Sequence, residues 1–151
     1  MRYRPHRSVE NSIWLELRAA LWPETPREEL AAEMPEILAN PEKAVVVFAE
    51  DPSGEIVGFA EISIREGAEG CSSHPVGYVE GWFVRESHRR RGVGRGLLEF
   101  AEKWLSERGC TEIASDAEID NELSHRAHRA LGFAEVSRVV LYAKPVGSRN
   151  G

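Results

Sequence analysis

The segment Tyr78–Phe100, with the sequence YVEGWFVRESHRRRGVGRGLLEF, decides the fold class of this chain. Its first seven residues are mostly aromatic or β-branched, which predicts a strand over residues 78–84. Apolar side chains then recur at helical spacing, which predicts a helix. These side chains are Val93, Leu97, Ala101 and Trp104. Gly81 interrupts the strand, and such a glycine is typical of a bulge or of a close approach by another backbone or a ligand.

A basic, glycine-containing turn joins this strand to this helix. Its arginines and glycines are Arg89, Arg90, Arg91, Gly92, Gly94 and Arg95. The first turn of a helix has free backbone N–H groups and the positive end of the helix dipole, and here several cations lie beside them. These features predict a site for a phosphorylated ligand. A cofactor with an amide-bearing arm and a diphosphate would lie along the bulged strand and end at this turn.

Two other glycine motifs do not fit the residues of this turn. A dinucleotide fingerprint requires a third glycine where the chain has Leu97, and a P-loop requires a Lys-Ser or Lys-Thr pair that does not follow. An arginine-rich nucleic-acid patch stays open as an alternative, although no aromatic residues alternate with the arginines and the chain is acidic overall. A plain basic surface turn is the other alternative, and it leaves the glycines unexplained.

The run Arg89–Gly94 resembles the (Arg/Gln)-x-x-Gly-x-(Gly/Ala) signature of the GCN5-related N-acetyltransferases, which move an acetyl group from acetyl-CoA to an amine. The order of elements and the later Ala-Leu-Gly-Phe at residues 130–133 extend the resemblance over nearly the whole chain. Within the family, the chain is similar to bacterial aminoglycoside acetyltransferases that modify the 6′-amino group. The residues that carry this similarity are Leu21-Trp22-Pro23, Glu80-Gly81 with Phe83-Val84, and Ala114-Ser115-Asp116.

Length and composition predict one domain over residues 1–145, with a frayed end at residues 146–151. The formal net charge of -6 argues against nucleic acid as a partner and mildly favours a cationic substrate. Cys71 and Cys110 have no metal-ligand companions at a recognisable spacing and are predicted to be reduced thiols. No segment has the length and apolarity of a signal core or a membrane span. We therefore expect a cytoplasmic protein with no metal site and no membrane partner.

The whole chain predicts an α/β fold, in which a mixed, mainly antiparallel sheet has helices on both faces. Besides the segment described above, strands are expected over residues 1–4, 44–49, 55–65, 110–116 and 136–143, and helices over residues 13–21, 26–39 and 123–131. The strands at 44–49 and 55–65 should form an antiparallel hairpin. The expected strand over residues 1–4 and the splaying of the sheet between Val84 and Asp116 follow from the resemblance.

The start of the second helix is predicted at Thr25-Pro26-Arg27-Glu28. Thr25 would cap it, Pro26 would take its first position, and Glu28 would return a hydrogen bond to the cap. The resemblance places the preceding loop at the acceptor site, so Thr25 would be both cap and wall. Trp14 is expected to pack in the core. For Trp22 two interpretations stay open, which are core packing and contact with the acceptor.

The resemblance implies which residues bind acetyl-CoA. The backbones of Trp82, Phe83 and Val84 would pair with the pantetheine arm as strands pair, and an N–H group near Phe83 would stabilise the oxyanion. The pyrophosphate would be held at the basic turn, whose residues are Arg89, Arg90, Arg91, Gly92, Val93, Gly94 and Arg95. Asn121 matches a position that contacts the cofactor, and capping of the last helix by Asn121 is the alternative.

The resemblance also implies an acidic acceptor site formed by Glu80 and Asp116, with Trp22 and Thr25 beside it. The amine must lose a proton before it attacks the thioester, and Glu80 and Asp116 are the candidates to accept it. Alternatively, both carboxylates hold the cationic sugar while solvent takes the proton.

Three positions depart from the related enzymes. His128 stands where many members have a tyrosine that protonates the leaving thiolate, and it is either an acid or a packed helix residue. Ser137 stands where the 6′-modifying enzymes tend to have a carboxylate, and Gly67 stands where they often have an aromatic residue. The last two departures concern the choice of antibiotic more than acetyl transfer.

We therefore expect an enzyme that acetylates the 6′-amine of aminoglycosides, confers resistance to them and forms a homodimer. The alternatives are acetylation of another amine, such as a polyamine, a protein N-terminus or a lysine. A non-enzymatic alternative is a module that senses CoA or binds nucleic acid.

Overall fold

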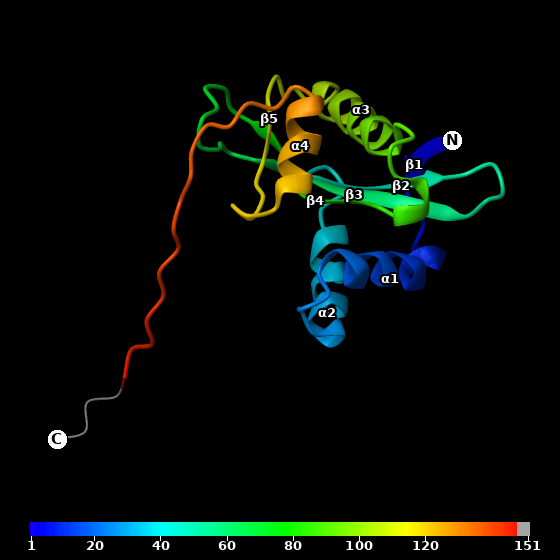
Figure 1. Cartoon of the computed structure of the whole chain (residues 1–151), viewed down its shortest axis with the longest axis horizontal. Helices are drawn as coiled ribbons and strands as arrows, with labels where there is room; N and C mark the ends of the chain where they lie inside the picture. The colour runs from blue at the N-terminus through cyan, green and yellow to red at the C-terminus, as the bar shows by residue number, and fades with distance from the viewer. Residues whose placement is uncertain (148–151) are drawn as a thin grey trace.

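A five-stranded sheet in the order β1-β2-β3-β4-β5 forms the centre of the computed structural model, which describes residues 1–147 (Figure 1). Its strands are β1 (Arg2–Pro5), β2 (Ala44–Glu50), β3 (Ile56–Arg65), β4 (Val76–Val84) and β5 (Ile113–Ser115). All neighbouring strands are antiparallel except β4 and β5, which are parallel. The predicted mixed, mainly antiparallel sheet and the predicted hairpin of β2 and β3 are confirmed.

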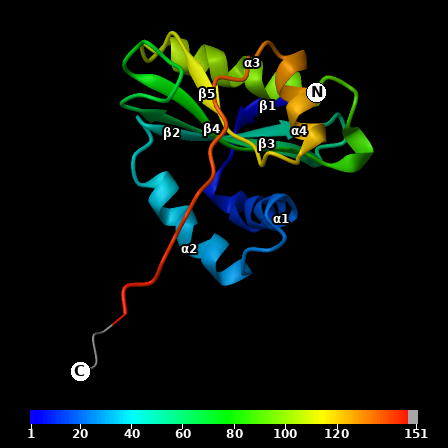
Figure 2. The same ribbon diagram turned by 60° about the vertical axis from the view of Figure 1, so that its left-hand side comes forward.

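Helices cover both faces of this sheet, as the sequence predicts. The helices α1 (Asn11–Leu21) and α2 (Arg27–Leu38) lie on one face, and α3 (Val93–Ser106) and α4 (Glu122–Ala130) lie on the other (Figures 1 and 2). Two short 3-10 helices, Ser8–Glu10 and Glu86–His88, connect them to the strands. No helix among residues 1–147 is long and apolar enough to cross a membrane.

Each layer of helices packs on the sheet through its own hydrophobic cluster. The predicted stripe of α3 is buried, and it packs with inward side chains of β2 and β3 such as Val47 and Ile62. On the opposite face, Trp14 and Leu17 of α1 pack with Phe48 and Phe59 and are fully buried. Strands covered on both faces carry almost continuous apolar runs, and β2 and β3 are such strands.

The predicted cap of α2 at Thr25 is wrong by one residue. The helix begins at Arg27, its cap position is Pro26, and no side chain bonds to that end. The backbone N–H of Thr25 instead donates to the carbonyl of Trp22 at 3.2 Å, and the N–H of Leu30 bonds to the Pro26 carbonyl at 3.1 Å. The chain therefore makes a tight turn from Trp22 to Thr25, and the backbone of Pro26 is extended. The first helical hydrogen bond is accepted by the Pro26 carbonyl.

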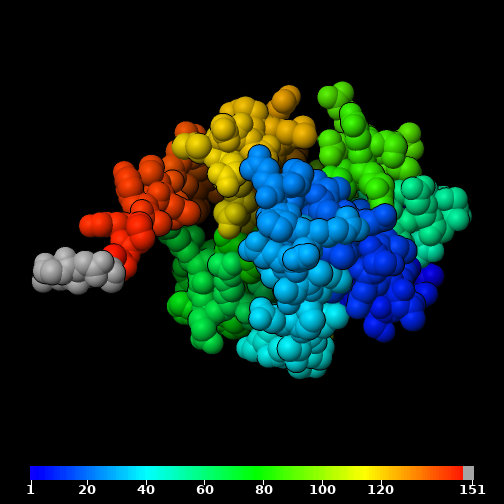
Figure 3. Space-filling view, turned by 90° about the horizontal axis from the view of Figure 1, so that it is seen from below, coloured from blue at the N-terminus to red at the C-terminus, as the bar shows by residue number. Residues whose placement is uncertain are grey.

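The predicted strand over residues 136–143 is also wrong for this single chain. Residues 134–147 belong to no helix or strand and run away from the body of the molecule (Figures 1 and 3). Their apolar side chains are exposed, with Leu141 at 90% and Tyr142 at 91%. A strand is stable only when its backbone groups pair with a neighbour, and this segment pairs with none among the described residues. Of the predicted frayed end at residues 146–151, residues 148–151 lie outside the described residues.

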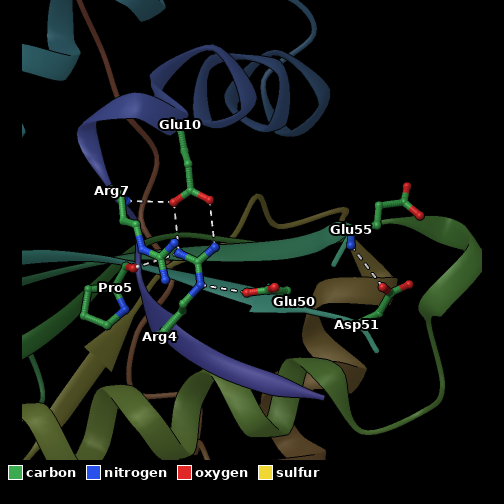
Figure 4. Close-up of polar contacts among 7 residues, drawn as sticks. All are labelled: Arg4, Pro5, Arg7, Glu10, Glu50, Asp51 and Glu55. Atoms are coloured by element: carbon green, nitrogen blue, oxygen red, sulfur yellow. Dashed lines mark hydrogen bonds and ion pairs between the residues drawn. The ribbon is translucent and has the colours of Figure 1, made fainter. Parts of the chain in front are cut away.

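A buried arginine joins the N-terminal strand to the rest of the sheet. The Arg4 guanidinium donates to both carboxylate oxygens of Glu10, at 2.9 and 2.7 Å, and its Nε donates to Glu50 at 2.8 Å (Figure 4). The backbone N–H of Arg7 also donates to Glu10 at 2.9 Å. These contacts lower the pKa of Glu10 to about 2, chiefly through the hydrogen bonds from Arg4.

Replacing Glu10 by Gln is expected to lower the free energy of unfolding by about 1–2 kcal/mol at pH 7. The folded pKa of Glu10 lies below its usual value, so its stabilisation is present above pH 4.5 and is lost as the pH falls towards 2. Urea denaturation of both proteins at pH 7 and pH 3 measures this, and the difference should shrink at pH 3. The exposed carboxylate Glu102 supplies the control variant Glu102→Gln. An equal difference at both pH values would contradict the assignment.

Candidate active site

The free edge of β4 begins where β4 and β5 part. Their pairing runs from Gly77 with Ile113 to Val79 with Ser115 and goes no further. On its other side, β4 remains paired with β3 as far as Val84. The backbone groups of residues 81–84 that face away from β3 are therefore available to an extended ligand, as in the pairing of strands. This is the splayed sheet that the sequence predicts.

The start of α3 lies beside this edge. Gly92 is the cap residue with a φ of 78°, a left-handed conformation that favours glycine. The first bond of the helix runs from the Gly96 N–H to the Gly92 carbonyl at 3.0 Å, so the amides of residues 92–95 are outside the helical ladder. Together with the exposed side chains of Arg90 and Arg91, they form a site suited to a phosphate group.

Two arginines of the predicted phosphate site also have structural contacts. Arg89 donates through Nε to the carbonyl of Val84 at 2.9 Å, and Arg95 donates to the carbonyl of Ala130 at 3.2 Å. Gly94 likewise has a packing role, because a Cβ atom there would lie 3.0 Å from the ring of Trp82. These contacts fix the turn against β4 and α4 and leave its backbone amides free.

Asn121 is the cap of α4, as one of its two sequence interpretations predicts. Its side-chain oxygen accepts a hydrogen bond from the backbone N–H of Ser124 at 3.1 Å. A contact between Asn121 and a cofactor stays a prediction.

Glu80 is the extra residue of a β-bulge. In the ladder of β3 and β4, Ile62 pairs with Val79 and Glu61 pairs with Gly81, so Glu80 has no partner of its own. The bulge turns its side chain out of the sheet, and Glu80 is exposed although its segment is otherwise mostly buried. The bulge that the sequence offers as one explanation of Gly81 is present, and its extra residue is the preceding Glu80.

Two residues that the sequence analysis missed hold the Glu80 carboxylate. The Ser63 hydroxyl donates to Oε2 at 2.6 Å, and the Arg65 guanidinium donates to both oxygens, at 2.5 Å to Oε1 and at 2.8 Å to Oε2. Both residues lie on β3 and reach Glu80 across the antiparallel ladder. The register of the two strands determines this contact, and no local motif indicates it.

Asp116 is held by Tyr78, another residue that the sequence analysis did not assign to the site. The Tyr78 hydroxyl donates to Oδ2 of Asp116, and the Arg65 guanidinium lies over the Tyr78 ring at 3.4 Å from its centroid. Burial, followed by the hydrogen bond to Asp116, raises the pKa of Tyr78 to about 12. Tyr78 therefore remains a protonated donor at neutral pH. Glu80 and Asp116 are thus brought together through Arg65 and Tyr78.

Trp22 follows α1 and lies against the bulge. A Cβ atom at position 81 would lie 2.8 Å from Cη2 of Trp22, so the indole ring requires a glycine there. The Arg18 guanidinium lies over the Trp22 ring, at 4.9 Å from the ring centroid. The close approach that Gly81 permits is therefore made by Trp22, a residue of the same chain, and not by a ligand.

The arginine that contacts the Trp22 ring belongs to a buried ion pair between Arg18 and Glu61. The Arg18 guanidinium donates to both oxygens of Glu61, at 2.6 and 2.5 Å, and the Trp14 indole N–H donates to Glu61 at 2.9 Å. Arg18 and Glu61 are only 2% and 3% exposed. Burial raises the pKa of Glu61, and the hydrogen bonds from Arg18 oppose this shift. The prediction that Trp14 is a packing residue is confirmed.

A cavity of about 460 Å³ opens between α2 and the sheet, beside Trp22 and Glu80. Glu33 and Glu36 of α2 also line it, together with Arg18 and Lys43, so its wall holds both charges with carboxylates in excess. A neighbouring hollow of about 220 Å³ includes Thr25 and shares Trp22. The structure therefore groups Trp22 with Glu80 and Trp22 with Thr25. The larger cavity lies within the range of roughly 300–1,000 Å³ that is common for ligand sites, and the smaller hollow lies below it.

His128 lies in a packed position behind β4 and β5. Its Nδ1 donates to the Ser124 carbonyl at 2.7 Å, so its Nε2 accepts from the Ser115 hydroxyl at 2.8 Å. The ring also packs edge-on against Trp82 and Phe133. Of the two interpretations that the sequence leaves open, this arrangement matches the packed helix residue.

Residues 14–133 match the family described as Acetyltransferase (GNAT) family. A relative from Klebsiella aerogenes, called "Aminoglycoside N(6')-acetyltransferase type 1", is 44% identical over 145 residues, which covers 95% of each chain. The chain belongs to the GNAT family of acetyltransferases. The resemblance inferred from the sequence is thereby confirmed.

Solved structures agree with this assignment. The apo crystal structure of the aminoglycoside 6'-N-acetyltransferase AAC(6')-IG from Acinetobacter haemolyticus has a TM-score of 0.89 and 37% identity, and the match covers 97% of this chain and 100% of that chain. A structure of AAC(6')-Iy in complex with the bisubstrate analog CoA-S-monomethyl-acetylneamine has a TM-score of 0.87 and 37% identity, with 96% and 98% covered. The predicted α/β fold of the GNAT type is confirmed.

Proposed function

We propose that this protein transfers the acetyl group of acetyl-CoA to the 6′-amino group of aminoglycosides and so confers resistance to them. The observation that carries this proposal is the match, over nearly the full length of both chains, to enzymes that bear this activity in their names. The local geometry agrees, because Glu80 lines a carboxylate-rich cavity at the start of the free strand edge, and Asp116 follows the neighbouring strand β5. A cationic amine and an extended thioester cofactor would meet there.

Acetyl-CoA would supply the acetyl thioester, and the residues of β4 and α3 would hold it. The free backbone groups of Trp82, Phe83 and Val84 are suited to bind the pantetheine arm. The amides of residues 92–95, flanked by Arg90 and Arg91, are suited to bind the pyrophosphate. The N–H group near Phe83 would stabilise the negative charge that develops on the carbonyl oxygen.

Glu80 and Asp116 would have different roles toward the acceptor, one in binding and one in proton transfer. The Ser63 hydroxyl donates to Oε2 of Glu80 and helps to fix the carboxylate, so Glu80 is suited to hold a cation in a fixed position. Tyr78 donates only to Oδ2 of Asp116, which leaves Oδ1 to accept the proton of the amine, directly or through water. We assign binding to Glu80 and proton acceptance to Asp116, with Trp22 and Thr25 as walls of the site.

A spectrophotometric assay of CoA release tests this function. The purified protein is given acetyl-CoA with kanamycin, tobramycin, spermidine or a short peptide. Turnover with the two aminoglycosides only is the expected result. Activity on spermidine or peptide without activity on either aminoglycoside would refute the proposed acceptor and retain acetyl transfer.

We also propose that the protein is cytoplasmic, where acetyl-CoA is made and where aminoglycosides act. Its partners would be small cationic substrates, and neither nucleic acid nor a membrane. The overall charge of -6 supports this, since a negative surface repels both nucleic acid and anionic lipid.

The exposed segment 134–147 supports a homodimer. Apolar side chains such as Val140, Leu141 and Tyr142 are 73–91% exposed in the single chain, and unpaired apolar strands tend to be covered by association. Light scattering on the full chain should give about twice the chain mass of 16.9 kDa. The variant Leu141→Asp/Tyr142→Asp should give the mass of one chain. A single-chain mass for the unaltered protein would exclude the homodimer.

A further inference from the structure

Arg65 occupies the carboxylate that the proposed function assigns to the acceptor. Its guanidinium binds Glu80 through Nη2 at 2.5 Å to Oε1, and through Nη2 and Nε at 2.8 and 3.1 Å to Oε2. Together with the Ser63 hydroxyl, these donors approach both oxygens of Glu80. An ammonium group that is to bind Glu80 directly would meet a cation already in place.

The guanidinium also contacts Tyr78, the residue that holds the second acidic group of the site. It stacks on the Tyr78 ring at 3.4 Å, and the Tyr78 hydroxyl bonds to Asp116. The pKa of Arg65 is raised, mainly by the hydrogen bonds to Glu80, and the charge of Asp116 adds to this. Arg65 thus neutralises Glu80 in the free protein.

This ion pair is placed so that it can open. The side chains of Arg65 and Glu80 are 45% and 34% exposed. Water and salt screen this pair, so even its two-oxygen geometry contributes less than it would in the interior. A long arginine side chain can swing into solvent from the end of β3, where Arg65 is the last residue of the strand.

We propose that Arg65 takes the place of the acceptor's ammonium group on Glu80 in the free protein, and that the acceptor binds by displacing it. This inference rests on the proposed function. Binding then exchanges one cation for another on Glu80. Because the ion pair with Arg65 must open first, the affinity for every amine is lowered by the same factor. Acceptors with several ammonium groups offset this loss through further contacts with the acidic cavity, and simple monoamines do not. Arg65 would therefore weaken every amine, and the contacts with the cavity would let polycationic acceptors bind despite this loss.

The variant Arg65→Met tests the exchange, because methionine keeps the apolar stem and removes the charge. The KM for tobramycin is expected to fall about 3–5-fold, the size of a lost exposed ion pair, with kcat changed less than about twofold. Arg65→Lys, which keeps the charge, should remain close to the unaltered protein. Lys103→Met, an equal change of charge on the exposed side of α3, is the matched control and should leave the KM unchanged.

Two further measurements complete the test. Calorimetry gives the dissociation constant of tobramycin without acetyl-CoA, and it should fall by the same factor in Arg65→Met. In the unaltered protein, the 15Nε resonance of Arg65 should move on addition of tobramycin to the position of solvent-exposed arginines. A KM that rises in Arg65→Met and is restored in Arg65→Lys would overturn the exchange and make Arg65 a positioning residue for Glu80. An unchanged KM or an unmoved resonance would also overturn it.

The two proposals fail in distinguishable ways. If the unaltered protein neither binds nor acetylates any aminoglycoside, the proposed function fails and the exchange fails with it. If it acetylates tobramycin and Arg65→Met behaves like the unaltered protein, only the exchange fails.

Discussion

Replacing Asp116 by Asn is expected to lower kcat for aminoglycoside acetylation by about 10²–10³-fold, the usual contribution of a positioned general base. The amide oxygen of asparagine can still accept the hydrogen bond from Tyr78, so the local structure should persist. The amide cannot take the proton of the attacking ammonium group. Rates of CoA release at saturating tobramycin, measured from pH 6 to pH 9, give the loss directly.

Two control variants separate proton acceptance from binding. Glu80→Gln should raise the KM about tenfold and leave kcat within about threefold, because Glu80 is assigned to hold the cation and charged hydrogen bonds contribute on this scale. Glu118→Gln alters an exposed carboxylate two residues beyond Asp116 and should change neither constant. If Glu80→Gln loses kcat and Asp116→Asn does not, the two roles are reversed. If neither variant loses kcat, solvent accepts the proton.

Replacing Arg18 by Met is expected to lower the free energy of unfolding by about 3–5 kcal/mol at pH 7. Glu61 would remain buried without its cation, and a single unpaired charge in the interior is strongly destabilising. Urea denaturation followed by tryptophan fluorescence measures the loss. The loss should be smaller at pH 5, because a raised pKa lets Glu61 bind a proton in the folded state and become neutral.

The double variant Arg18→Met/Glu61→Gln is the control for this prediction. It removes both charges and keeps an acceptor for the Trp14 indole N–H, so it should recover most of the lost stability. Equal losses in the single and the double variant would show that packing of the arginine side chain on Trp14 and Trp22, and not the unpaired charge, is responsible.

The central strand, the basic turn and α3 could be predicted because their signals are local. Alternation, helical periodicity and a glycine pair each act over a few residues, and Val93 and Leu97 are buried as the pattern requires. The bulge at Gly81 was likewise visible as a glycine inside a strand. Its cause was not visible, because the Trp22 ring that requires the glycine comes from a segment 59 positions earlier (81 − 22 = 59).

The parts of the site that were missed depend on strand register. Arg65 and Ser63 reach Glu80 only because β3 and β4 pair with a shift at the bulge. Arg18 and Glu61 are charged residues whose burial depends on tertiary pairing, and no periodicity distinguishes them from a solvated pair. The predicted strand at residues 136–143 is wrong because strand formation also depends on a partner that is distant in the sequence. Its β-branched composition is a local signal, but no strand within residues 1–147 pairs with it.

The acceptor position of the transferred acetyl group is the central claim, and a matched pair of aminoglycosides tests it most directly. Neomycin and paromomycin differ in carrying an amine or a hydroxyl group at the 6′ position. The account predicts rapid CoA release with neomycin, a product whose NMR spectrum places the acetyl group on the 6′-nitrogen, and no turnover with paromomycin. Equal turnover of both compounds, or an acetyl group on another nitrogen of neomycin, would contradict the account.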